Sequence, residues 1–458
     1  MNKSSLPNAP ANFDLRNLGR KTIVALCLQI AGFSLEYLIQ VFLARWLGRV
    51  EYGLYAYTMA WCLTLAIPAG LGFPRTVLRF VSEYRVREEW GKMRGVLFSS
   101  WQLTLTSGLA IALVGSTVVT LIDRYSDFAF APALALGLWL IPLLSLLNLQ
   151  EDMGRGAKSL VLAYGPSKVL WPTLVLVGCL ALSHGESQTL TGITAINVTI
   201  ATLAGVLLFQ LALIGLGYAP EIASASIIYN RREWLKVALP LLFHRAFREI
   251  LRKIDVIMVG TFIGTKAAGI YNAAASTALW ASFMLTTINL VVAPTFTSLY
   301  TQKDKTGLQK VVSTSTLWIA WPSILISLVL IFAAKPVLGI FGSEFVAAHW
   351  SLKILVLSQL TNALCGSVGT FLVMTGYQNK ILMVSSTCAI ANLVLDAIAI
   401  PIWGMNGAAL ATAAALMVYN IWSSILVFRN TGIYSSAPIA FIGRTLFGNS
   451  TTENTENS

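Results

Sequence analysis

Charged side chains are scarce in this chain of 458 residues. Only 11% of its residues are Asp, Glu, Lys or Arg, whereas ordinary soluble domains contain about 25%. Because 56% of the residues are hydrophobic, the composition predicts an all-α integral membrane protein that crosses the bilayer many times. The segments between its apolar stretches do not exceed roughly twenty residues, which leaves no room for an extramembrane catalytic domain. We therefore expect that the protein is not an enzyme.

Cysteine is also rare, and its pattern excludes two kinds of site. The five cysteines are an odd number, which argues against a disulfide framework, and their spacing is not that of metal ligands. We expect neither a metal nor a bound cofactor. All five lie in apolar stretches, where they would pack against other side chains: Cys27, Cys62, Cys179, Cys365 and Cys388.

Twelve apolar stretches are long enough to be transmembrane helices. Their approximate ranges are 21–44, 53–73, 95–122, 128–149, 159–183, 190–217, 234–262, 269–297, 311–334, 351–375, 381–402 and 407–428. The first is longer than the core of a signal peptide and has no clear cleavage site, so we expect it to be retained. The expected organisation is a cytoplasmic segment (1–20), a six-helix bundle (21–220), a second six-helix bundle (221–430) and a cytoplasmic tail (431–458).

The formal charge of +12 would suggest a nucleic acid as partner of a soluble chain, but its distribution points to membrane topology. If the twelve stretches alternate in direction, 21 of the 32 Lys and Arg residues fall on the side of the N-terminus and five on the other. By the positive-inside rule both termini are cytoplasmic. The chain is thus expected in the cytoplasmic (inner) membrane, without a nucleic-acid partner.

A short motif occurs twice, each time where one predicted helix ends and the next begins. The sequence LGRVEYGLY at 47–55 recurs as IGTKAAGIY at 263–271, displaced by 216 residues. The glycines suit a tight turn in which positive φ is required. Because each half contains six helices, both halves enter the membrane in the same direction, which predicts pseudo-symmetric bundles with a binding cavity between them.

The stretch from Trp234 to Gly264 begins and ends as a membrane span but carries charges at its centre. Its 29 residues to Phe262 give a helix of about 43 Å, so these charges lie at mid-span, where charged groups face a bundle interior or an aqueous cavity. Arg245, Arg248 and Arg252, spaced i, i+3, i+7, share one helical face. Asp255 extends that stripe, and Glu249 and Lys253 complete the cluster.

Two interpretations of this cluster remain open. Glu249 could pair with Arg245 and Lys253, so that the cluster neutralises itself between helices. However, it contains four cations and two acids, and an excess of positive charge in a cavity favours an anion. The same choice between helix packing and a transport path applies to three other buried charges: Glu36, which the repeat places opposite Arg252, Lys168 and Asp396.

Six stretches resemble the oligosaccharide-lipid flippases of the multidrug/oligosaccharidyl-lipid/polysaccharide exporter superfamily, such as O-antigen flippases. They are ARWLGRVEYGLYA from Ala44, GLGFPRTVLRFVSEYR from Gly70, DVIMVGTFIGTKAAGIYNAA from Asp255, LGIFGSEFVAA from Leu338, TGYQNK from Thr375 and IPIWGMNGAALATA from Ile400. The resemblance implies a MATE-like fold of two six-helix bundles around a central cavity. The central charges of the seventh helix exceed what is expected of the family.

The resemblance also implies transport of a polyprenyl-diphosphate-linked oligosaccharide to the outer leaflet by alternating access, for cell-surface polysaccharide synthesis, with a polymerase or ligase as potential partner. The candidate diphosphate contacts are Arg245, Arg248, Arg252, Lys253 and Lys168. Glu36, Glu249, Asp255 and Asp396 would compensate charge or bind a coupling cation, and the membrane potential could also drive export. The alternatives are a cation-coupled multidrug antiporter, a peptidoglycan-precursor flippase and a membrane glycosyltransferase or polymerase.

Overall fold

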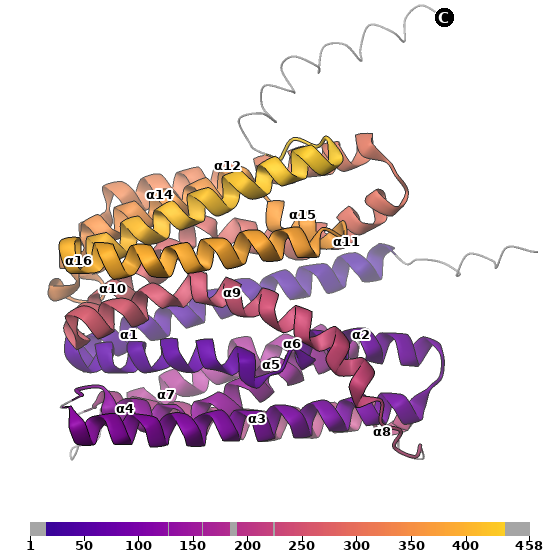
Figure 1. Ribbon diagram of the computed structural model, residues 1–458, viewed down its shortest axis with the longest axis horizontal. Coiled ribbons are helices and arrows are strands. Elements are labelled where there is room, and N and C mark those ends of the chain that lie inside the picture. The colour runs from indigo at the N-terminus through magenta and orange to yellow at the C-terminus, as the bar shows by residue number, and fades with distance from the viewer. Residues whose placement is uncertain (1–14, 127, 158, 184–189, 223–224, 436–458) are drawn as a thin grey trace, which may run out of the picture.

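The computed structural model describes residues 15–435, except 127, 158, 184–189 and 223–224, and this part of the chain contains helices and turns without a strand. The helices run side by side in an elongated bundle (Figure 1). Helices from the first half form one side of the bundle and helices from the second half form the other, with α1 and α9 between them.

The helices of the first half are α1 (Leu15–Ala69), α2 (Phe73–Val86), α3 (Trp90–Tyr125), α4 (Ala131–Gly137), α5 (Leu140–Gly156), α6 (Leu160–Tyr164), the π-helix η1 (Gly165–Leu170), α7 (Trp171–Ser183) and α8 (Gly192–Ile222). Those of the second half are α9 (Arg231–Ile263), α10 (Thr265–Ala278), η2 (Leu279–Ser282), α11 (Phe283–Thr301), α12 (Lys305–Phe332), α13 (Ala334–Gly339), η3 (Ser343–Ala348), α14 (His349–Cys365), α15 (Val368–Met374) and α16 (Gln378–Thr431).

Two of these helices each contain two of the expected spans. Helix α1 is interrupted at Gly48, with φ 70° and ψ 174°, and α16 at Gly404, with φ 60° and ψ −139°. A side chain is strongly disfavoured at such positive φ values, so glycine allows the chain to reverse without a long loop. Both breaks fall between expected spans: 21–44 and 53–73 in α1, and 381–402 and 407–428 in α16.

By length and apolar composition, the described residues contain eight helices that could cross a membrane, or nine if the bent pair around Gly366 is one span. The difference from the expected twelve has a physical cause. Each of the long helices α1 and α16 counts once although its chain reverses at a glycine. Helix α9 is excluded by the charges at its centre. The described part of the chain is therefore that of an all-helical membrane protein with eight to nine candidate spans.

The two copies of the repeated motif contact each other. A Cβ atom on Gly53 would lie 1.9 Å from the carbonyl oxygen of Thr265, and one on Gly269 would lie 2.6 Å from that of Arg49. Both pairs are related by the displacement of 216 residues. In the same way, Gly264 has φ 109° and ψ −177°, close to the conformation of Gly48. Positive φ is confirmed at Gly48 and Gly264, the first glycine of each copy, whereas Gly53 and Gly269 are helical and instead allow the halves to meet backbone to backbone.

The ends of the chain fall partly outside the described residues. Helix α1 begins at Leu15 rather than at the expected position 21, and α16 ends at Thr431. Residues 1–14 of the expected cytoplasmic segment, and 436–458 of the expected tail, lie outside the description. The start of α1 and the end of α16 lie at the same end of the bundle (Figure 1).

Candidate functional site

Helix α9 carries the central charges. These charges differ in exposure because other helices pack against only part of α9. Phe247, Ile250 and Leu251 pack against α16, which fixes the rotation of α9 about its axis. Arg248 and Arg252 are exposed, whereas Asp255, three residues beyond Arg252, is buried at 3% exposure. On the helical stripe expected from the sequence, Arg248 and Arg252 are therefore exposed and Asp255 is buried.

Only part of the cluster neutralises itself. Arg252 Nη1 lies 3.9 Å from Glu249 Oε2, and the side chain of Arg252 remains 55% exposed. Lys253 is half-buried on the same turn. Among the described residues, no carboxylate is found at ion-pair distance from Arg248 or Lys253. A free cationic surface of this kind attracts an anion.

The first half contributes an ion pair within electrostatic range of this surface. Lys168 Nζ donates to Glu36 Oε1 at 3.2 Å, which joins η1 to α1. The two elements approach closely at Gly32, where an added Cβ would lie 2.8 Å from the Cβ of Lys168. The charge of Lys168 is within electrostatic range of Arg252 on α9. The structure thus links Lys168 to the central cluster, a connection that the sequence spacing did not reveal.

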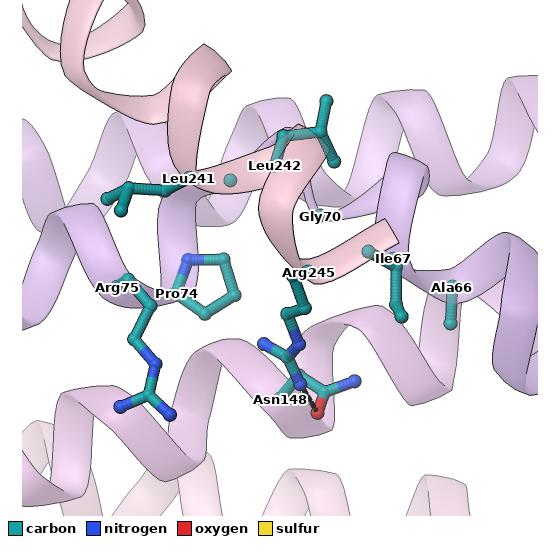
Figure 2. A pocket seen from close by; sticks show the side chains of 10 residues that line it. Ala66, Ile67, Gly70, Pro74, Arg75, Asn148, Leu241, Leu242 and Arg245 are labelled. Carbon is teal, nitrogen blue, oxygen red and sulfur yellow. Dashed lines mark hydrogen bonds between the residues drawn. The ribbon is translucent and has the colours of Figure 1, made fainter. Parts of the chain in front are cut away.

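Arg245 has a different partner. Its guanidinium donates to Asn148 Oδ1 on α5 at 2.7 Å, and the two residues line a pocket with the end of α1 and the start of α2 (Figure 2). Arg75 of α2 lines the same pocket and lies 3.6 Å from Asp152 Oδ1 on α5. Asp152 also pairs with Arg155 at 2.7 Å.

The sequence analysis missed the polar residues at the end of α5. They are Asn148, Glu151, Asp152 and Arg155, spaced i, i+3, i+4, i+7, which places them on one helical face. The expected span ended at 149 because charges begin there, whereas α5 continues to Gly156. The helical spacing was the signal that could have identified this face. Glu151 lies within electrostatic range of both Lys168 and Arg245, so the end of α5 connects them.

Asp255 belongs to a second polar group, which lies inside the second half. Its carboxylate accepts hydrogen bonds from Tyr271 at 2.7 Å, from Thr412 at 3.4 Å and from the amide of Val256 at 2.9 Å. These bonds tie α9 to α10 and α16. Asp255 therefore faces packed protein rather than the surface formed by Arg248 and Arg252.

Asp396 adds a second carboxylate to this group. It is fully buried, accepts from the side-chain amide of Asn392 at 3.0 Å, and lies within electrostatic range of Asp255. Oδ1 of Asp396 and Oδ1 of Asn392, both inside the protein, have no hydrogen-bond partner in the described structure. No group of three or more His, Cys, Asp and Glu residues in the described ranges could hold a metal ion. A cation here would rely on two carboxylates supplemented by amide and hydroxyl oxygens.

Two family models match the chain. One, described as polysaccharide biosynthesis protein, matches residues 18–152 and 173–300. The other, described as MatE, matches residues 240–398. A relative is the probable low-salt glycan biosynthesis flippase Agl15 of Haloferax volcanii, which is 25% identical over 422 residues, covering 88% of this chain and 82% of the relative.

Solved structures confirm the expected MATE-like fold. An inward-facing multidrug resistance MATE family transporter of the MOP superfamily superimposes with a TM-score of 0.73 at 13% identity, over 90% of this chain and 98% of that one. The lipid II flippase MurJ in an inward closed conformation gives a TM-score of 0.67 at 17% identity, over 95% of this chain and 94% of that one. At these identities the likeness concerns the fold alone.

Proposed function

Because the chain belongs to the polysaccharide biosynthesis protein family, we propose that it is a flippase that moves a polyprenyl-diphosphate-linked oligosaccharide from the cytoplasmic to the outer leaflet of the cytoplasmic membrane. The matched families are transporters and not enzymes, so the glycosyltransferase alternative is set aside. The glycan would supply cell-surface polysaccharide synthesis, with a polymerase or ligase as a further partner. The name of the relative from Haloferax volcanii supports this function.

The proposed architecture is twelve spans in two bundles, 21–220 and 221–430, which alternate between openings to the two sides. The reciprocal contacts of Gly53 and Gly269 support the pseudo-symmetry. The breaks at Gly48 and Gly404 support counting α1 and α16 as two spans each. Helix α9 is then counted as a span as well, because its central charges can face the first half of the chain instead of lipid.

The single observation that carries the proposal is the cationic surface of α9 within electrostatic range of the Glu36–Lys168 pair. Arg248 and Arg252 are exposed there, and Arg252 is incompletely paired. Guanidinium groups bind phosphate oxygens through two parallel hydrogen bonds. We assign the diphosphate to Arg248 and Arg252, with Lys253 and Lys168 nearby and Glu36 and Glu249 as counter-charges in the empty state.

A cation site would couple transport to an ion gradient. We assign it to Asp396 and Asp255 because two buried carboxylates within electrostatic range of each other need a cation or a proton to offset their repulsion. The unpartnered oxygens of Asp396 and Asn392 are available as ligands, and oxygen ligands suit a small hard cation. Alternatively, a proton on one carboxyl group would serve the same role.

The multidrug antiporter remains the second candidate because the MatE model matches part of the chain. A cavity for cationic drugs needs an excess of acidic side chains, whereas the exposed charged residues on α9 are mostly basic. A peptidoglycan-precursor flippase is favoured only by the likeness to MurJ, which concerns the fold.

The test is transport of a fluorescent polyprenyl-diphosphate oligosaccharide across proteoliposomes. Arg248→Ala and Arg252→Ala should each lower the initial rate about tenfold or more, because each removes a charged hydrogen-bond donor to the diphosphate. Arg124→Ala is the matched control, since Arg124 is exposed at the end of α3. Wild-type rates in both variants would reduce the cluster to helix packing, and transport of a cationic dye instead of the glycolipid would favour the antiporter.

A further inference from the structure

A cavity of about 380 Å³ lies between the two halves of the chain. The first half contributes Tyr37 of α1 to its wall, and the second half contributes Thr277 of α10, Trp280 of η2 and four residues of α12 between 325 and 330. The hydroxyl groups of Tyr37 and Thr277 bond to each other at 3.2 Å. Because these two polar groups satisfy each other, the cavity presents mainly apolar surface to a ligand.

The cavity opens sideways, towards lipid. At its base, Thr277 and Leu330 are buried, with exposures of 0% and 7%. At its rim, Leu325 and Val329 are 62% and 61% exposed. Both belong to α12, one of the helices that could cross the membrane, so their exposed side chains face hydrocarbon.

Contacts between the halves cover the cavity at the end of α12. The rings of Tyr37 and Phe341 meet edge to face, with centroids 5.7 Å apart. Arg49 pairs with Glu344 at 3.3 Å. Because Phe341 and Glu344 follow α12 in the chain, these contacts lie beyond the cavity. A lipid chain in the cavity would therefore leave into the bilayer rather than through the end of the bundle.

The cavity lies at the depth of the proposed diphosphate site. Tyr37 follows Glu36 directly, so the two differ by about 1.5 Å along α1. Glu36 accepts from Lys168 at 3.2 Å and is within electrostatic range of Lys253 on α9. Consecutive residues of a helix point about 100° apart, so α1 presents Glu36 to η1 and Tyr37 to η2. A lipid with its diphosphate beside this ion pair can thus pass its chain along Tyr37 into the bilayer.

The size and the lining of the cavity suit an isoprenoid chain. At about 30 Å³ for a water-sized group, the cavity has room for roughly twelve carbon atoms, or about two isoprene units. The rings of Tyr37 and Trp280 meet edge to face, with centroids 5.7 Å apart, and form a rigid apolar wall. An isoprene unit contains a double bond and has fewer rotatable bonds than a saturated segment of equal length. It therefore loses less conformational entropy when the cavity holds it.

We propose that this cavity binds the isoprene units next to the diphosphate of the transported lipid, at a lateral opening between α1 and α12. This inference rests on the proposed function and adds the residues that receive the lipid chain. Since both halves line the cavity, its width depends on the position of one half relative to the other. Binding of the chain is thereby tied to the alternation between the two openings.

The test is photolabelling of the full chain in phosphatidylcholine nanodiscs by a polyprenyl diphosphate with a diazirine in its second isoprene unit. Mass spectrometry should locate the label on residues 325–330. Val329→Trp fills the cavity and should lower this labelling about tenfold, because the chain loses apolar surface to bury. Leu328→Trp is the matched control, since Leu328 is exposed on the same helix but does not line the cavity. Melting temperatures of both variants would verify that they fold.

The outcomes separate the cavity from the function. Equal labelling of Val329→Trp and Leu328→Trp overturns the cavity as the site of the chain. Competition by phosphatidylglycerol as strong as that by unlabelled polyprenyl diphosphate overturns the assignment to an isoprenoid chain. Labelling of residues 325–330 without glycolipid transport by the wild type supports the cavity and contradicts the proposed function. Transport without this labelling contradicts the cavity alone.

Discussion

At the scale of single residues, the two buried aspartates of the second half differ in how their oxygens are satisfied. Asp255 accepts from two hydroxyl groups and one backbone amide, which stabilises its position between three helices. Asp396 accepts only from Asn392, and its second oxygen is left without a partner in the described structure. Burying an unpaired carboxylate oxygen is costly, so this position is where a bound cation or proton gains most.

We expect sodium ions to stabilise the wild-type protein and not the Asp396→Asn variant. A ligand that binds only the folded state raises its stability in proportion to the logarithm of ligand concentration. Replacing choline chloride by sodium chloride should raise Tm by about 2 to 5 °C in the wild type. The measurement is thermal unfolding in detergent at constant ionic strength.

The control for this experiment is Asp123→Asn, at an exposed position near the end of α3, which should keep the sodium response. An equal response in Asp396→Asn would remove Asp396 from the cation site. A wild type that responds to pH but not to sodium would assign the group to a proton.

The sequence indicated which charged residues interrupt an apolar stretch. It did not indicate the surroundings of those residues where a neighbouring helix packs against them. Helical spacing placed Arg252 and Asp255 on one stripe, but it could not show that α10 and α16 close over Asp255. Likewise, spacing gave no link between Lys168 and α9, because that link runs through the packing of η1 against α1. Long-range contacts of this kind are absent from any local pattern.

At the scale of elements, the contact between the repeated motifs depends on the absence of side chains. We expect Gly53→Ala to destabilise the protein by about 1 to 3 kcal/mol, because overpacking forces the backbones of the two halves apart. The added Cβ would lie 1.9 Å from the Thr265 carbonyl oxygen. Chemical unfolding in detergent would measure the change in the free energy of unfolding.

The matched control is Gly205→Ala in α8, where a Cβ would meet nothing within 4 Å. Alanine in an open helical position is expected to stabilise by up to about 1 kcal/mol. If Gly53→Ala and Gly205→Ala behaved alike, the contact would be loose enough to accept a methyl group. The motif itself was recognisable in the sequence, whereas the direct contact between its copies required the structure.

At the scale of the whole molecule, the apolar stretches predicted the all-helical membrane fold, because membrane helices need long apolar runs. The described residues show eight to nine candidate spans, and the count of twelve stays a prediction. The ends of the helices were less predictable. Helix α5 continues seven residues beyond the expected end at 149, to Gly156, since its charges pair within the protein. The π-helix η1 also had no sequence signal beyond Pro166.

The charge distribution predicts that both termini are cytoplasmic. In a variant without its five cysteines, Lys335→Cys in α13 should react with a membrane-impermeant maleimide added to intact cells. Lys305→Cys at the start of α12 should react only after the membrane is permeabilised. Both positions are exposed, so accessibility within the fold does not limit the reaction. The reverse labelling pattern would invert the proposed topology.

The glycine contact at one end of the bundle also has a mechanical consequence. At Gly53 and Gly269 the two backbones are in direct contact without a side chain between them. This contact can therefore serve as a pivot about which one half rotates relative to the other. Helix α9 extends 33 residues from its junction with α10, a lever arm of about 50 Å. Tilting one half by about 10° around this pivot would displace the far end of the helix by about 9 Å. In the proposed alternation between openings to the two sides, a contact of this kind would turn a small angular change into a large displacement at the far end of α9.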